Sequence, residues 1–123
     1  MKHKPNSKYY RKKADEAWAK QIRSVGACEI CGGKGRLNAH HLIKRGRLRF
    51  RHDLSNGVCL CVVHHQWDDD CCAHGDLYAI EGFMLWLKDH RPGQWKWYRE
   101  NKDDKRKPDW TYLDKYEELK GTL

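Results

Sequence analysis

Two short motifs hold residues of the kinds that bind metal ions. Cys28 and Cys31 form a Cys-x-x-Cys pair, and a Cys-x-x-His pair follows at Cys61 and His64. Two such pairs about thirty residues apart are typical of a four-ligand structural zinc site, in which each pair closes one turn of the chain. The spacing therefore predicts one structural Zn2+, with the residues between the pairs held as a single loop.

Further polar residues lie in or next to this loop, and a purely structural zinc site has no use for them. His40 and His41 are adjacent, Asn56 follows, and His65 comes directly after the second pair. Neutral imidazole can accept a proton near neutral pH and can ligate a divalent cation. These residues predict a second, chemical site framed by the zinc site. Neighbours on a strand point to opposite faces, so the strand must end or bend at the histidine pair.

The composition bounds the class of protein. The chain has 123 residues, which predicts one domain over 1–123, and its mean hydropathy of -1.02 leaves a small core that a metal cross-link would supplement. No apolar run reaches the roughly 18 residues of a membrane span, and no signal peptide is visible, so we expect a cytoplasmic protein without membrane contact. Cysteine pairs in a reducing cytosol bind metal more often than they form disulfides. Cys59 is expected to be a small buried residue, and no chemistry is assigned to Cys71 and Cys72.

The net charge of +8 is concentrated in two segments. Residues 1–13 carry six Lys or Arg and residues 34–52 carry seven, and neither segment has an acidic residue. Positive charge next to the histidine pair favours a polyanionic partner, with DNA as the first choice, although a solvated basic surface is the alternative. The residues predicted to contact DNA are Arg45, Arg47, Arg49 and Arg51.

The pattern of apolar residues and chain breakers predicts an α+β protein. Residues 1–8 are expected to form a disordered basic arm, and residues 9–26 a helix that stops at Gly26. Within 27–75, strands over 36–43 and 57–61 and a short helix over 64–70 would form a ββα unit. Residues 76–123 are expected to form a helical extension, with helices over 76–88 and 111–119 and a linker with aromatic anchors over 94–110.

These motifs together resemble the HNH endonucleases of the ββα-metal type, and most of all the small, zinc-stapled, phage-associated kind. The resemblance covers about residues 27 to 90 and rests on two ligand sets in register. The motif residues are Cys28-x-x-Cys31, Ala39-His40-His41-Leu42-Ile43, Asn56 and Leu60-Cys61-x-x-His64-His65. The chain departs from the family at His64, where cysteine is usual, so the implied zinc set is Cys3His, which zinc accepts.

The resemblance implies a role for each residue of the second site. It implies a ββα-metal core with a structural zinc, flanked by N-terminal and C-terminal helices. His41 would be the general base, and Asn56 would hold the loop so that His41 keeps its orientation. A turn-forming asparagine is the alternative for Asn56. His40 and His65 would bind a catalytic cation such as Mg2+, Mn2+ or Ni2+.

Two residues are candidates for a third ligand of that cation. Asp69 lies four residues after His65, hence on the same face of a helix, and His74 competes with it for this part. An ordinary surface carboxylate is the alternative for Asp69. The remaining histidines are expected to have no part in the chemistry: His3, His52 and His90.

The expected function is hydrolysis of DNA phosphodiester bonds to 5′-phosphate and 3′-hydroxyl ends. Water attack on a phosphodiester needs a base to activate the water and a cation to neutralise charge on the phosphate. A zinc-knuckle module that only binds nucleic acid is the alternative, and a junction-specific resolvase is a variant of the nuclease. Candidate partners besides DNA are a second copy of the chain and phage packaging or recombination proteins. If the resemblance holds, the expected location is the host cytoplasm.

Overall fold

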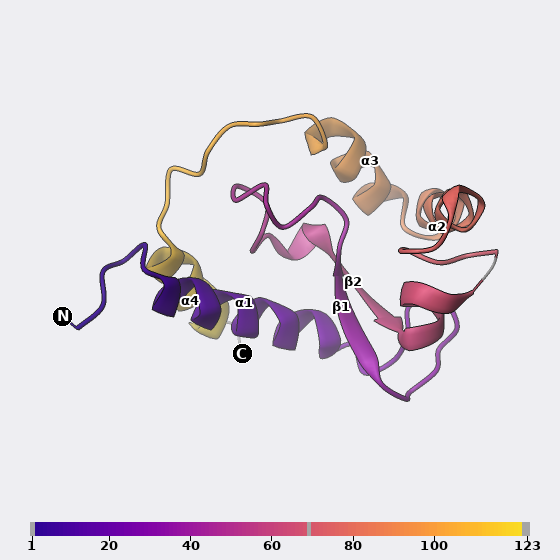
Figure 1. Ribbon diagram of the computed structural model, residues 1–123, viewed down its shortest axis with the longest axis horizontal. Coiled ribbons are helices and arrows are strands. Elements are labelled where there is room, and N and C mark those ends of the chain that lie inside the picture. Colours follow the sequence, from indigo (N-terminus) through magenta and orange to yellow (C-terminus); the bar gives the residue numbers. More distant parts are fainter. Residues whose placement is uncertain (1, 69, 122–123) are drawn as a thin grey trace.

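The computed structural model describes residues 2–68 and 70–121. The elements run α1 (Lys8–Arg23), β1 (Leu37–His41), the 3-10 turn η1 (Leu54–Asn56), β2 (Gly57–Cys61), the π-helical turn η2 (Val63–Trp67), α2 (Leu77–His90), α3 (Pro92–Asn101) and α4 (Tyr112–Gly121). Four α-helices surround a two-stranded antiparallel sheet (Figure 1). The predicted α+β class is confirmed at this coarse level. No helix among the described residues has the length and apolarity that crossing a membrane requires.

The hairpin of β1 and β2 lies between helices α1 and α4 on one side and helices α2 and α3 on the other (Figure 1). Its register pairs Leu37 with Cys61 at one end and His41 with Gly57 at the other. The second strand has the predicted bounds, and its first four residues are buried. The hairpin therefore separates the end that carries the cysteine ligand from the end that carries His41.

The two faces of β2 pack into two small apolar clusters, because successive side chains of a strand alternate. Val58 and Leu60 pack with Phe83 and Leu87 of α2. Cys59 is fully buried, as expected, on the opposite face. Its cluster consists of residues from α1, β2 and α4: Ala17, Trp18, Ile22, Cys59 and Leu119.

The N-terminal arm is ordered next to α4, contrary to the expectation of disorder. Asn6 Oδ1 accepts a hydrogen bond from the Tyr112 N–H at 3.0 Å, and the Pro5 carbonyl accepts from the Leu113 N–H at 3.0 Å. These acceptors satisfy N–H groups in the first turn of α4, which have no partner within that helix. The arm thereby joins the two ends of the described chain, as Figure 1 shows for α1 and α4.

The linker predicted over 94–110 is wrong in its first part, where α3 forms instead. Pro92 occupies the first turn of α3, where a missing N–H costs nothing. Gln94 Nε2 donates to the carbonyls of Ser55 and Gly57 at 2.8 Å each. These bonds fix α3 on the start of β2. Residues 102–111 then cross without regular structure from α3 to α4 (Figure 1).

Close packing of α1 on β2 requires glycine at position 57. A Cβ there would clash with the side chains of Ile22 and Trp18. We expect Gly57→Ala to lower the free energy of unfolding by about 1 to 3 kcal/mol, because the Ile22 and Trp18 side chains would have to shift. Urea unfolding measures this loss. Gly46→Ala is the control, since a Cβ at Gly46 meets nothing within 4 Å; equal unfolding midpoints for the two variants would contradict the packing.

Candidate metal centres and active site

The four predicted zinc ligands converge in space. The ligand atoms of Cys28, Cys31, Cys61 and His64 all lie within 4.8 Å of one another. Cys31 Sγ lies 3.8 Å from Cys61 Sγ, and Cys61 Sγ lies 3.4 Å from His64 Nδ1. A tetrahedral zinc with Zn–S bonds of about 2.3 Å keeps its sulfur ligands about 3.8 Å apart. This group, the Cys3His cluster, therefore has the spacing that can hold a zinc ion.

Hydrogen bonds of the backbone N–H groups hold the first cysteine pair against β2. Gly32 adopts a φ of +75°, which glycine tolerates, and the Gly33 N–H donates to Cys31 Sγ at 3.4 Å. The Glu29 N–H donates to the Cys59 carbonyl at 2.9 Å, and the Cys59 N–H donates to the Glu29 carboxylate at 2.7 Å. The turn is thus fixed to the strand that ends in the second pair.

Backbone amides also favour the thiolate at Cys28. Burial raises the pKa of this thiol, but hydrogen bonds from the backbone of Cys61, Cys31 and Ile30 outweigh burial and lower the pKa. Zinc binds cysteine as the thiolate, so this environment suits a metal ligand.

The second pair leads into a π turn, not the α-helix predicted over 64–70. The Asp68 N–H donates to the Val63 carbonyl at 2.8 Å, which is a bond between residues five apart. The chain then doubles back, and the His74 N–H donates to the His65 carbonyl at 3.0 Å. This return places His74 beside His65. Asp69 lies outside the described residues, so its predicted part in binding the cation stays a prediction.

His40, His65 and His74 form a second group, the three-histidine cluster. Their imidazole nitrogens lie within 4.8 Å of one another. The ring centroids are 4.6 Å apart for His65 and His74, 4.8 Å for His40 and His74, and 5.3 Å for His40 and His65. Three imidazoles that converge in this way can hold a divalent cation with positions left for water or substrate. The structure therefore places His74, one of the two candidates for the third ligand, beside the two predicted ligands.

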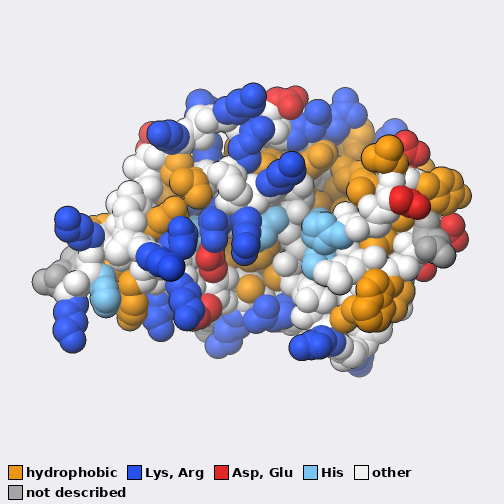
Figure 2. All heavy atoms as spheres, viewed as in Figure 1, with side chains coloured by type: hydrophobic (Ala, Val, Ile, Leu, Met, Phe, Trp, Pro, Cys, Tyr) orange, Lys and Arg blue, Asp and Glu red, His pale blue; other side chains and the backbone are white. Residues whose placement is uncertain are grey.

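The three-histidine cluster opens into a cavity that it shares with His41. The cavity has a volume of about 350 Å³, and its other lining residues are Ala39, Lys44 and Arg45. Figure 2 shows Lys and Arg side chains gathered beside histidines that reach the surface in the middle of the face in view. An anion that enters the cavity would meet positive charge at its edge.

Burial favours the neutral form of two imidazoles of the cluster, those of His40 and His65. It lowers the pKa of His40 to about 3, with further contributions from His74, His65 and His41. Burial and the neighbouring His74 also lower the pKa of His65. A neutral imidazole has a free lone pair, which is the form that ligates a metal.

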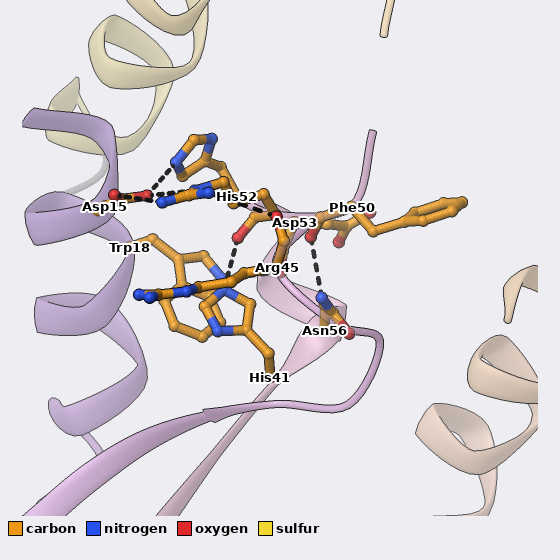
Figure 3. A network of polar contacts seen from close by, with 9 residues as sticks. Asp15, Trp18, His41, Arg45, Phe50, His52, Asp53 and Asn56 are labelled. Atoms are coloured by element: carbon orange, nitrogen blue, oxygen red, sulfur yellow. Dashed lines mark hydrogen bonds and ion pairs between the residues drawn. The ribbon is translucent and has the colours of Figure 1, made fainter. Parts of the chain in front are cut away.

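His41 lies on the other face of β1 and has a different environment. Its Nε2 lies 2.9 Å from the carbonyl oxygen of Arg51, and its ring stacks on Trp18 with centroids 3.9 Å apart and planes 13° apart (Figure 3). A carbonyl only accepts, so Nε2 carries the proton and Nδ1 has the lone pair. Burial lowers the pKa of His41, although the bond to the Arg51 carbonyl opposes this shift. His41 therefore has the neutral form that a base requires.

Asn56 ends β1 and holds the following loop. Its side chain is fully buried; Oδ1 accepts from the Ile43 N–H at 2.6 Å, and Nδ2 donates to the carbonyls of Ile43 at 3.0 Å and Phe50 at 3.1 Å. The Asn56 carbonyl accepts from the Leu42 N–H at 3.0 Å. These bonds replace strand pairing, so β1 ends at His41 and not at Ile43 as predicted. They let His40 and His41 open to one cavity.

Arg51, which was predicted to contact DNA, is bonded within the fold. Its guanidinium bonds both carboxylate oxygens of Asp15 at 2.8 Å, and its side chain is 13% exposed. A run of basic residues cannot reveal such a partner, because Asp15 lies far away in the sequence on α1. His52, expected to have no part, is buried with Nε2 at 2.7 Å from Asp15 Oδ1.

The other three arginines that were predicted to contact DNA differ in their bonding partners and in their exposure. Arg47 donates to the Asp104 carbonyl at 3.3 Å, and Arg49 donates to the Lys107 carbonyl at 3.1 Å. Both are partly buried and fasten the segment between α3 and α4 to the loop. Arg45 is exposed and lines the cavity. Of the four arginines predicted to contact DNA, Arg45 has the position that best suits a phosphate contact.

Comparison of the chain with protein-family models, with curated proteins and with solved structures gave no match. We therefore infer function from the chemistry and geometry of the residues themselves.

We expect the Cys3His cluster to make folding dependent on zinc. We expect Cys31→Ser to lose zinc and to lower the melting temperature by about 10 °C or more, because a closed four-ligand site contributes directly to folding. Zinc content and thermal unfolding measure both effects. Cys71→Ser is the matched control, since Cys71 lies outside the cluster. A Cys31→Ser protein with full zinc and an unchanged melting temperature would exclude this site.

Proposed function

We propose that the chain is a metal-dependent DNA endonuclease of the HNH type, which hydrolyses phosphodiester bonds to 5′-phosphate and 3′-hydroxyl ends. One observation carries the proposal: a half-buried histidine with a lowered pKa, His41, opens to the same cavity of about 350 Å³ as three convergent imidazoles. A base and a cation site that share one cavity are the two requirements of phosphodiester hydrolysis. A zinc knuckle that only binds nucleic acid would need neither of them.

The order of elements supports the HNH assignment with one departure. A hairpin is followed by a turn that carries a zinc ligand, His64, and a cation ligand, His65, on consecutive residues. The third element of the expected ββα unit is here the short turn η2. The next helix, α2, packs against the site, because the Phe83 ring lies 5.6 Å from that of His40 at a near-perpendicular angle.

In the proposed mechanism His41 Nδ1 takes a proton from the attacking water, while its Nε2–H stays bonded to the Arg51 carbonyl. A divalent cation held by the three-histidine cluster would supply a Lewis acid for the phosphate and leaving oxygens. Lys44 and Arg45, both exposed at the cavity, attract the phosphate backbone to the site.

The donor set favours a transition metal for this cation. The cluster consists of three imidazoles, and no carboxylate of the described residues belongs to it. Imidazole suits Zn, Ni and similar ions, whereas Mg2+ prefers carboxylate and water oxygens. We therefore propose Mn2+ or Ni2+ ahead of Mg2+ as the activating ion.

Substitutions of His41, His64 and His65 should change the cleavage of supercoiled plasmid in different ways. We expect His41→Ala to keep its zinc and its melting temperature but to cleave about 100-fold more slowly or worse, because it lacks the base. His65→Ala should keep zinc and recover partly at higher metal concentration, and His64→Ala should lose zinc, fold and activity together. Cleavage by the parent should be faster with Mn2+ or Ni2+ than with Mg2+ at equal concentration.

His90→Ala is the control for these variants, because His90 is exposed and lies outside both metal clusters. Parental cleavage by His41→Ala would refute the mechanism. A parent that binds DNA but cleaves none with any of the three cations would favour the binding module.

The salt dependence of DNA binding should separate two arginines of the same loop. Each phosphate contact contributes about -0.9 to the slope of log K against log salt concentration. Arg45→Gln should reduce the steepness by about that amount, because Arg45 is exposed at the cavity. Arg47→Gln is the matched control and should leave the slope unchanged, since Arg47 is bonded to backbone carbonyls. A reversed pattern would place the DNA elsewhere on the loop.

A further inference from the structure

An ion-paired network joins α1 to the loop that holds His41 (Figure 3). Arg51 donates from Nε to Asp15 Oδ1 and from its terminal nitrogen to Oδ2, both at 2.8 Å. His52 Nε2 lies 2.7 Å from the same Oδ1. Two parallel bonds from a planar guanidinium fix direction as well as distance. One carboxylate of α1 thus fixes two consecutive residues of the loop.

The network is partly shielded from water. The side chains of Arg51, Asp15 and His52 are 13%, 34% and 2% exposed. Burial alone would raise the pKa of Asp15, but the hydrogen bonds from Arg51 and His52 hold that pKa well below its usual range. Asp15 is therefore a carboxylate throughout the physiological pH range, and its bonds to the loop persist there.

Arg51 is also the residue whose backbone meets His41. Its carbonyl oxygen lies 2.9 Å from His41 Nε2. Trp18, three residues after Asp15 on the same face of α1, supplies the second contact by stacking on the His41 ring at 3.9 Å. The Trp18 indole is itself fixed, since its Nε1–H donates to the Asp53 carbonyl at 2.8 Å. Trp18 sets the plane of the imidazole, and the Arg51 carbonyl sets its rotation within that plane.

We propose that Asp15 is a positioning residue for His41: by clamping Arg51 it holds the carbonyl that keeps His41 in the Nε2–H tautomer, with Nδ1 free to accept a proton. The inference rests on the proposed function for the use of that lone pair. The Asn56 side chain bonds Ile43 and Phe50, so its bonds within the described part of the chain hold the loop before Arg51. The loop residues after Phe50 depend on α1.

The first test compares two neighbouring carboxylates of α1 in plasmid cleavage. Asp15→Asn keeps the shape of the side chain but removes the charge that orients Arg51. We expect its kcat to fall about 10- to 100-fold, with KM for DNA and zinc content unchanged, because misplacing a base affects the chemical step. Glu16→Gln makes the same charge change on an exposed residue and should stay within about twofold of the parent. Equal kcat values for the two variants would overturn the proposal.

A second variant changes the other partner of the clamp. Arg51→Lys keeps the charge but cannot make two parallel bonds, so its kcat should fall to a similar extent. The double variant Asp15→Asn/Arg51→Lys should lose no more than either single variant, since one clamp is broken in all three. Losses that add in the double variant would show two separate effects and contradict the proposal.

Nitrogen-15 NMR of the histidine rings tests the clamp without any cleavage. In the parent, His41 should show a proton on Nε2 and none on Nδ1, and Asp15→Asn should show a mixture of the two tautomers. A parent with the Nδ1–H tautomer would overturn the proposal, even if Asp15→Asn failed to fold. If the parent shows the Nε2–H tautomer and Asp15→Asn shows the mixture, but the parent cuts no DNA, the endonuclease is refuted and the clamp stays in place.

Discussion

Four side chains whose ligand atoms lie within 4.8 Å of one another join the two ends of the segment that carries the candidate active site. The Cys3His cluster joins the turn after α1 to the end of β2, and it fixes His64. His65 is the next residue, so its place beside His40 follows from the position of its neighbour. The two apolar clusters are small, and a metal cross-link would add what apolar burial alone does not supply. The structural and the proposed catalytic cation sites are therefore separated by one peptide bond.

The alternation of side chains along β1 gives the two adjacent histidines different environments. His40 faces α2 and the other imidazoles, where burial keeps it neutral. His41 faces α1, where an indole and a carbonyl set its orientation. The two sides meet in one cavity because the bonds of Asn56 end the strand at His41. The proposed ligand and the proposed base thus come from consecutive residues, and each takes its properties from the helix that it faces.

Local signals in the sequence predicted the parts of the site that depend on spacing. The Cys-x-x-Cys and Cys-x-x-His pairs gave the four convergent ligands, and the bounds of β2 were correct. Such local signals could not predict contacts between residues that lie far apart in the sequence. The clamp of Asp15 on Arg51 joins residues 36 positions apart, and a run of basic residues looks the same whether its members face solvent or a half-buried carboxylate. The return of the chain to η2 rests on bonds from the Ala73 and His74 N–H groups to the His64 and His65 carbonyls, which no local pattern indicates. α3 begins at Pro92 and fills the first part of the predicted linker.

The most direct test of the account is anomalous X-ray diffraction from crystals of the zinc-loaded protein soaked in Mn2+. Two metal peaks per chain are expected. One should be zinc within the Cys3His cluster, and the other should lie among the three imidazoles, beside His41. A single metal per chain, or a second metal away from the three-histidine cluster, would contradict a structural and a catalytic ion held by His64 and His65 on consecutive residues.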